Sequence, residues 1–164
     1  MDKLSIWQQN INKSPTCQHD IISNKRLVTK GINIIALQEP ALSKSGLTIA
    51  SRDWITIYPS EHTNNPLKTR SIMLIRADTS SKSWNQLEFP SSNVTATQIT
   101  EPWGKLTIFN VYNDRERDDT ISLLIDYHCR HRETLERATM GEVHILWIGD
   151  FNRHHPLWDS PKDM

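Results

Sequence analysis

The sequence predicts a single α+β domain in which two stacked β-sheets lie between outer helices, a layered α/β/β/α sandwich. Three observations support this fold class. A strand–helix–strand pattern opens the chain, five short β-rich segments fill its middle, and a helical segment followed by an apolar strand closes it. The length of 164 residues fits one domain, residues 1–164, with a substantial core.

The opening unit consists of two strands joined through a helix. Leu4–Gln9 mixes Ile and Trp with polar residues, as expected of a short first strand. Ser14 and Pro15 fit the N-cap and the first position of one helix that we expect to close at Gly31. The apolar run Ile32–Leu37 predicts a strand buried on both faces. Such a unit predicts parallel strands and a right-handed crossover.

The middle of the chain is rich in short β segments. Polar, Pro-bearing or Gly-bearing stretches separate them, a pattern typical of successive antiparallel strands. The predicted strands are Trp54–Tyr58, Ser71–Arg76, Trp84–Phe89, Asn93–Ile99 and Lys105–Tyr112.

The last third predicts a long second helix and a final strand. Asp118–Thr120 offers acidic and capping residues, and the helix should continue past Leu135. Val143–Ile148 predicts another buried strand. Only a short segment follows this strand, so we expect the sandwich to be incomplete at its C-terminal end, without its last strands.

Composition leaves the functional class open. Lys plus Arg and Asp plus Glu both number 19, so the chain lacks the positive charge of an architectural nucleic-acid binder. Cys17 and Cys129 suggest neither a disulfide framework nor a zinc ribbon, which favours a reduced intracellular compartment. No signal peptide or membrane-spanning run is evident, so no membrane partner is expected.

Polar residues stand where the predicted strands end. Asn10, Glu39 and Tyr112 close three of them, and Asp150 and Asn152 follow the last. In layered α/β folds such strand ends converge on a cleft. Mg²⁺ prefers oxygen ligands and is usually held by one or two carboxylates plus substrate phosphate, so the set suits phosphate-ester hydrolysis. Glu39 and Asp150 are the candidates to divide cation binding and water activation.

Four segments in this order resemble the motifs of the endonuclease/exonuclease/phosphatase superfamily: Ile6–Ser14, Leu37–Pro40, Asn110–Asn113 and Ile148–Trp158. They are similar, more narrowly, to the endonuclease domain of non-LTR retrotransposons, especially fungal elements. The resemblance covers essentially the whole chain. It implies a deoxyribonuclease I-like sandwich and a phosphodiesterase that uses Mg²⁺ or Mn²⁺ to nick DNA, leaving a 3′-hydroxyl.

The resemblance also implies a role for each site residue. Asn10 would help order the metal and the phosphate, and Glu39 would ligate the divalent cation. Tyr112 would contact the scissile phosphate. Asp150 would position or deprotonate the attacking water, and Asn152 would hold that carboxylate and the phosphate in place.

Residues beside these motifs are candidates for DNA binding. Solvated surface is the usual explanation for basic clusters such as Lys68–Arg70 and Arg130–Arg132, and the second is expected on the outer face of a helix. A zinc site built on the His154–His155 pair with His144 or Cys129 fits no tetrahedral signature. The residues expected to contact DNA are Asn113, Arg115, Arg117, Arg153, His154 and His155.

Two departures from the family pattern keep alternatives open. Asn113-Asp114 stands where relatives commonly carry a proline, and the terminal Ser-Asp-His motif is absent. The alternatives are a catalytically inactive remnant of such a domain and a superfamily phosphatase acting on other phosphate esters. For the enzyme we expect a monomer with DNA as partner, a reverse transcriptase domain encoded downstream, and a nuclear location if chromosomal DNA is the substrate.

Overall fold

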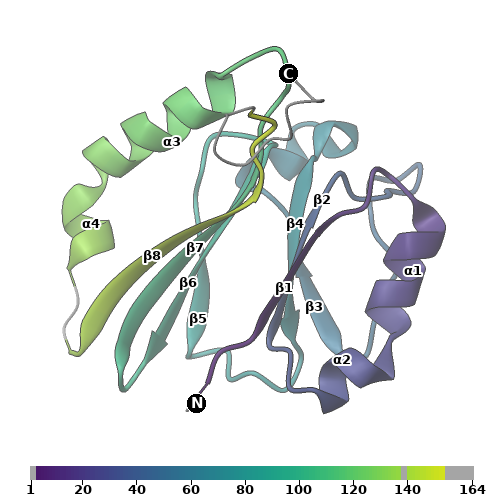
Figure 1. Ribbon diagram of the computed structural model, residues 1–164, viewed down its shortest axis with the longest axis horizontal. Helices are drawn as coiled ribbons and strands as arrows, with labels where there is room; N and C mark the ends of the chain where they lie inside the picture. The colour runs from purple at the N-terminus through teal and green to yellow at the C-terminus, as the bar shows by residue number, and fades with distance from the viewer. Residues whose placement is uncertain (1–2, 138–139, 154–164) are drawn as a thin grey trace, which may run out of the picture.

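Two four-stranded sheets pack face to face between two pairs of helices in the computed structural model, which describes residues 3–137 and 140–153 (Figure 1). One helix pair covers the outer face of each sheet, so the molecule has four layers. The α/β/β/α sandwich predicted from the sequence is confirmed.

Sheet A contains both strands of the opening unit. Its strands, in spatial order, are β1 (Ile6–Asn10), β2 (Ile34–Gln38), β4 (Ser71–Arg76) and β3 (Trp54–Ile57). β1 and β2 are parallel, as predicted, and β4 runs antiparallel to both of its neighbours. Every residue of β2 is buried, which confirms the interpretation of the apolar run.

The first helical region is broken, whereas the sequence predicted one helix. α1 (Pro15–Ser23) begins at Ser14, whose hydroxyl accepts a hydrogen bond from the Cys17 amide at 3.2 Å, as the predicted N-cap should. Asn24 then leaves the helical conformation, with ψ of 97°. Its side chain caps α2 (Lys25–Thr29) by accepting from the Arg26 amide at 3.0 Å. This local hydrogen bond explains the break.

Sheet B follows the chain order β5 (Trp84–Leu87), β6 (Val94–Glu101), β7 (Gly104–Tyr112) and β8 (Glu142–Asp150). β5, β6 and β7 are successive antiparallel strands, as predicted, and β8 returns parallel to β7. β4 and β5 do not pair but lie in different sheets, so the chain changes sheet between them. Two 3₁₀ turns, η1 (Ser60–Thr63) and η2 (Pro66–Lys68), precede β4.

The second helical region is also broken where one long helix was predicted. α3 (Asp119–Arg130) and α4 (Arg132–Glu136) are separated by His131. The His131 ring stacks on Tyr127, with centroids 4.1 Å apart, and its Nδ1 lies 2.9 Å from the Tyr127 carbonyl oxygen. A side chain competing for a helical carbonyl accounts for the break. None of the helices described here combines the length and hydrophobicity needed to span a bilayer.

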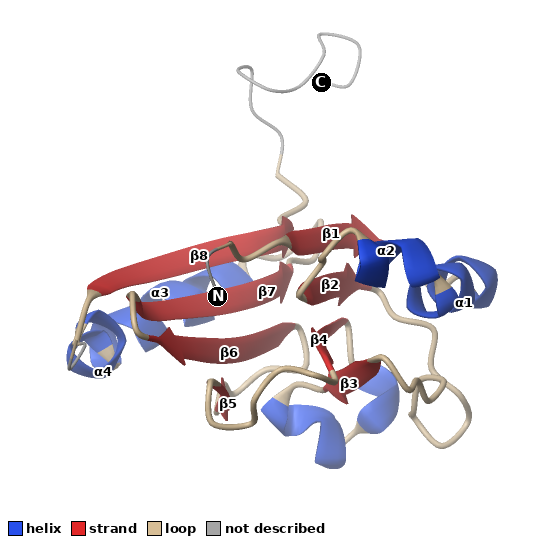
Figure 2. Cartoon of the chain, turned by 90° about the horizontal axis from the view of Figure 1, so that it is seen from below, coloured by secondary structure: helices blue, strands red, loops and turns tan. Residues whose placement is uncertain are grey.

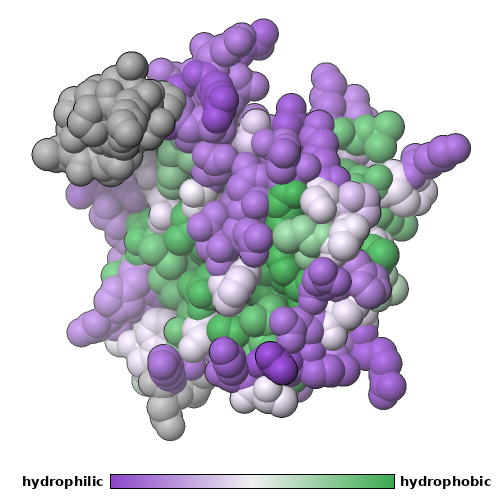
Figure 3. Space-filling model, turned by 45° about the vertical axis from the view of Figure 1, so that its right-hand side comes forward, coloured by the Kyte–Doolittle hydropathy of each residue, from purple (hydrophilic) through white to green (hydrophobic). Residues whose placement is uncertain are grey.

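β8 is an edge strand, so the prediction that it is buried was wrong. None of its residues is fully buried, and Trp147 is 37% exposed. β1 is likewise an edge strand, with Trp7 40% exposed, and both strands lie along the same side of the sandwich (Figure 2). Burial depends on neighbouring strands, and in the described ranges nothing pairs with the outer side of β1 or β8. Figure 3 shows hydrophobic residues gathered in the middle of one face of the molecule, with hydrophilic residues around them.

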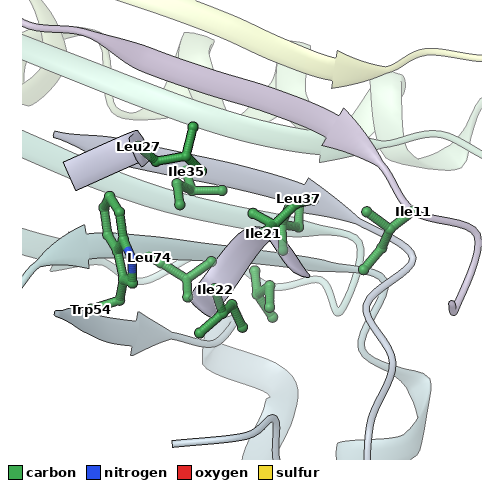
Figure 4. Close-up of a cluster of buried hydrophobic side chains, with 9 residues drawn as sticks. Ile11, Ile21, Ile22, Leu27, Ile35, Leu37, Trp54 and Leu74 are labelled. Atoms are coloured by element: carbon green, nitrogen blue, oxygen red, sulfur yellow. The ribbon is translucent and has the colours of Figure 1, made fainter. Parts of the chain in front are cut away.

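Three apolar clusters fill the spaces between the layers. The first joins sheet A to α1 and α2 through residues such as Ile21, Leu27 and Trp54 (Figure 4). The second lies between the two sheets, and the third joins sheet B to α3 and α4 through Leu124 and Leu135. The two sheets are thus fixed to each other and to their helices by continuous burial.

We predict that Gly149→Ala destabilises the domain by roughly 1–3 kcal/mol. Gly149 has φ of +137°, and an added Cβ would lie 1.9 Å from the Val111 carbonyl oxygen of β7. Denaturant unfolding measures the effect. Gly31→Ala is the matched control, because φ is +75° there but nothing lies within 4 Å of the added atom. Equal losses for the two variants would contradict a close approach of β7 and β8 at Gly149.

Candidate active site at the carboxyl ends of four strands

The polar residues predicted to converge lie together at one end of the sandwich. Asn10 is the last residue of β1, Tyr112 of β7 and Asp150 of β8, and Glu39 directly follows β2. The Asn10 side-chain amide donates to Asp150 Oδ2 at 2.7 Å and so links sheet A to sheet B. Tyr112 is the register partner of Asp150. Residues from both sheets therefore form one cluster.

Glu39 is held in place mainly by its backbone. Its amide donates to the Arg70 carbonyl oxygen and its own carbonyl accepts from the Lys13 amide, both at 2.8 Å. The residue has φ of +48°, a conformation that non-glycine residues rarely adopt. Its side chain is 15% exposed, and Oε2 lies 3.3 Å from Arg70 Nη1. The carboxylate is thus fixed at the rim of the site with one positively charged neighbour.

Tyr112, the last residue of β7, brings the second sheet into contact with this ion pair. The Arg70 guanidinium stands 5.0 Å from the centroid of the buried phenol ring. Burial raises the pKa of Tyr112, and so do the negative charge of Glu39 and a hydrogen bond to its carboxylate, whereas Arg70 acts in the opposite direction. The phenol therefore keeps its proton at neutral pH and serves as a hydrogen-bond donor.

Asp150 is oriented by one hydrogen bond to each carboxylate oxygen. Asn10 donates to Oδ2, and the Asn152 amide donates to Oδ1 at 3.0 Å. Asn152 is held in turn, because its side chain donates to the Asn113 carbonyl oxygen at 2.6 Å and accepts from Arg115 Nε at 3.4 Å. The side-chain amide of Asn10 and the backbone amide of Asn152 thus fix the direction of this carboxylate.

Asn113 differs from the sequence interpretation. Its side chain is buried and donates to the carbonyl oxygens of Asp114 and Phe151, each at 3.1 Å. Its amide donates to the Asp150 carbonyl oxygen at 2.8 Å. Asn113 thus fastens the end of β7 to the chain after β8. The direct DNA contact expected from the sequence stays a prediction.

The basic residues proposed to bind DNA fall into two groups. Arg115 and Arg117 are exposed, and Arg115 contacts Asn152. Arg153 instead holds the 115–118 loop, donating to the carbonyl oxygens of Arg115 and Arg117 at 3.3 and 3.0 Å and pairing with Asp118. His154 and His155 lie outside the described residues. On α3 and α4, Arg130 and Arg132 pair with acidic side chains one turn away, as a solvated face should.

A polar network lies directly beneath the cluster, between the two sheets. The Asn110 side chain of β7 donates to the carbonyl oxygens of Leu37 and Ile72 in sheet A at 3.0 and 2.8 Å. Its Oδ1 accepts from Gln38, the residue before Glu39. Ser71 completes the connection by donating to the Asn110 carbonyl oxygen at 2.7 Å. The sheets are therefore joined by specific hydrogen bonds at the level of the site.

We predict that Asn110→Ala is strongly destabilising. The change removes the Asn110 bonds to two buried carbonyl groups of the β2–β4 ladder and leaves the buried Gln38 side-chain amide without its acceptor, at about 1–3 kcal/mol for an unsatisfied group. Chemical unfolding should show a loss of at least about 2 kcal/mol. The exposed Asn85 of β5 offers the control Asn85→Ala, expected to stay within about 0.5 kcal/mol of the parent. A small change at Asn110 would show that the network contributes little.

The donor set suits a hydrated hard cation. In residues 3–137 and 140–153, no group of three His, Cys, Asp or Glu side chains gathers in the way a fully protein-ligated metal site requires. Mg²⁺ needs less, since it keeps several waters and usually takes one or two carboxylates plus a substrate phosphate. The Glu39 carboxylate, hydrogen-bonded to Tyr112 and one residue after the register partner of Asn10, meets that requirement. The residues present thus fit Mg²⁺ or Mn²⁺.

Comparison with known proteins identifies the fold. No family model and no curated protein sequence matches the chain. Among solved structures, the endonuclease domain of TRAS1, a telomere-specific non-LTR retrotransposon, is similar over 97% of this chain, with a TM-score of 0.64 and 14% identity. The AP endonuclease LMAP from Leishmania major matches over 90%, with a TM-score of 0.64 and 12% identity. Humanized TDP2 of D. rerio matches over 94%, with a TM-score of 0.57 and 15% identity.

These likenesses show the fold alone. The chain has the endonuclease/exonuclease/phosphatase fold, of the deoxyribonuclease I-like type, as its motifs predicted. It spans 64%, 54% and 65% of the lengths of the three solved chains named above.

Arg70 lies in this cluster, whereas the sequence interpretation treated it as ordinary surface. Its cluster, Lys68–Arg70, looked like a solvated basic segment. Only the antiparallel pairing of β2 with β4 places the start of β4 beside Glu39. A non-local contact of this kind leaves no signal in the local sequence.

Proposed function

We propose that this domain is a divalent-metal phosphodiesterase of the retrotransposon endonuclease type, using Mg²⁺ or Mn²⁺ to nick DNA and leave a 3′-hydroxyl. One observation carries the proposal. Asp150, at the end of β8 in sheet B, and Glu39, directly after β2 in sheet A, lie at the same end of the sandwich. Asp150 is hydrogen-bonded to Asn10, and Glu39 is hydrogen-bonded to Tyr112, the register partner of Asp150. The fold shared with two proteins that are named endonucleases supports the same activity.

Glu39 and Asn10 are the residues that would hold the cation. When bound, a divalent cation neutralises negative charge on the phosphate and so favours attack on phosphorus. Tyr112 contributes a protonated phenol, because its raised pKa keeps the hydroxyl a donor, and it donates to a phosphoryl oxygen. Together these groups bind and polarise the scissile phosphodiester.

Asp150 orients the attacking water and accepts its proton. The hydrogen bonds from Asn10 and the Asn152 amide fix the carboxylate, so it presents a defined direction to that water. The water oxygen forms a bond to phosphorus as the bond from phosphorus to the 3′-oxygen breaks. The 3′-oxygen takes a proton from solvent, leaving a 3′-hydroxyl and a 5′-phosphate.

DNA contacts outside the reacting phosphate are local. Because the chain has no net charge, DNA binding depends on a few positively charged side chains near the site. The exposed Arg115, which contacts Asn152, and the exposed Arg117 are suited to flanking phosphates. The monomeric state, the nuclear location and the association with a reverse transcriptase remain predictions.

A second candidate is a catalytically inactive remnant of the same domain. It is favoured by the unpaired outer sides of β1 and β8 in the described ranges. The exposed edge and apolar surface of such a remnant would reduce its solubility.

Nicking of supercoiled plasmid in the presence of Mg²⁺ separates the two candidates. We expect the parent protein to convert plasmid to a nicked form that a DNA ligase reseals, since its ends are a 3′-hydroxyl and a 5′-phosphate. Glu39→Gln and Asp150→Asn should each lower the rate on the order of 10²-fold or more, because each removes a charge the reaction uses. The exposed Asp20 of α1 provides the control Asp20→Asn, which should not change the rate.

Two results would count against the assignment. Equal nicking by the parent and both site variants would discard Glu39 and Asp150 as catalytic residues. A folded parent protein that nicks with neither Mg²⁺ nor Mn²⁺ would favour the remnant.

A further inference from the structure

Arg70 lies at the centre of the cluster, and the proposed reaction gives this residue no role. Its guanidinium lies 3.3 Å from the Glu39 carboxylate and 5.0 Å from the centroid of the Tyr112 ring. It therefore contacts both the residue proposed to bind the cation and the residue proposed to contact the phosphate.

The backbone around Arg70 is fastened on two sides. The Arg70 amide donates to the Ser92 carbonyl oxygen at 2.9 Å, and its carbonyl accepts from the Glu39 amide at 2.8 Å. The preceding Thr69 is buried, and its hydroxyl lies 2.7 Å from Nδ1 of the buried His62. The side chain thus projects from a fixed point, so its position beside Glu39 follows from the fold.

The guanidinium itself is held loosely. Within the described part of the chain, its hydrogen bonding consists of one contact of 3.3 Å to Glu39, and the side chain is 31% exposed. Arginine has five N–H donors in a fork that matches phosphate oxygens, so most of them remain available. A group that only neutralised Glu39 would gain more from a short bidentate pair.

A cation at Glu39 and the guanidinium compete for the same carboxylate. Placing a divalent charge beside Glu39 removes the electrostatic reason for Arg70 to stay there. A phosphodiester bound at the Tyr112 hydroxyl would lie near the Arg70 guanidinium, which stands 5.0 Å from the centroid of that ring. The guanidinium would then have a new negatively charged partner.

We propose that Arg70 is a phosphate-binding residue of this site: it pairs with Glu39 in the absence of cation and transfers its guanidinium to the scissile phosphodiester when Glu39 binds the cation. This inference rests on the proposed function, because it requires that a DNA phosphate reaches the site. It predicts that replacing Arg70 strengthens the binding of the divalent cation and weakens the binding of DNA. A purely structural ion pair would not produce these opposite effects.

Two binding measurements on Arg70→Gln test it. Isothermal titration with Mn²⁺ alone should show tighter binding than to the parent, on the order of 10-fold, since the competing charge is gone. Fluorescence anisotropy with a labelled DNA duplex and Mn²⁺, in an Asp150→Asn background that blocks turnover, should show weaker binding. The slope of log affinity against log salt should fall by about one, as expected for one lost phosphate contact.

Two further variants serve as controls. Arg70→Lys keeps the charge and should restore most of the salt slope but only part of the affinity, because lysine lacks the fork. Arg130→Gln removes an exposed arginine of α3 that pairs with Asp126, and it should change neither measurement.

The outcomes separate this inference from the proposed function. If the Asp150→Asn protein binds duplex in the presence of Mn²⁺ and Arg70→Gln leaves the salt slope unchanged, Arg70 only balances the charge of Glu39 and the inference is wrong. Weaker Mn²⁺ binding by Arg70→Gln would also overturn it, since no competition would exist. If the protein binds Mn²⁺ but never DNA, the proposed function itself fails.

Discussion

Hydrogen bonds between the two sheets, centred on Asn110, are the constraint on which the site depends. The side chain reaches from β7 across the sandwich to backbone carbonyl groups of β2 and β4. Hydrophobic contacts hold the layers together without fixing their register, whereas a buried amide accepts only one relative placement of its partners. Glu39 directly follows β2, and Tyr112 lies two residues after Asn110. The spacing and register of the sheets therefore determine how these two residues meet.

The same principle explains why the site is divided between sheets. Each carboxylate is held by backbone geometry or by amides, Glu39 through a strained backbone and Asp150 through Asn10 and Asn152. Strain and buried polar groups are costly and persist where the surrounding packing over-determines them. They concentrate here at the end of the sandwich where charged groups face solvent. The costly features of the fold therefore lie at the four strand ends that carry the candidate site.

Local sequence patterns predicted most helices and strands, whereas strand pairing between distant segments determined which residues meet and which strands are exposed. The bounds of β4, the buried β2 and the cap at Ser14 follow from residue type and spacing and agree with the structure. The breaks at Asn24 and His131 were missed because single side-chain hydrogen bonds decide them. The sequence predicted that Asn10, Tyr112 and Asp150 converge because strand ends converge, whereas it gave no sign of the contact between Arg70 and Glu39, since only strand pairing brings those two together. The exposure of β8 likewise depends on neighbouring strands.

The central claim is that Glu39 and its neighbours form a cation site between the ends of the two sheets. Anomalous diffraction from crystals soaked with Mn²⁺ tests it most directly. The account predicts one strong anomalous peak within coordination distance of the Glu39 carboxylate, on the side facing Asn10 and Tyr112. Strong Mn²⁺ peaks elsewhere on the molecule, with none at Glu39, would contradict the account.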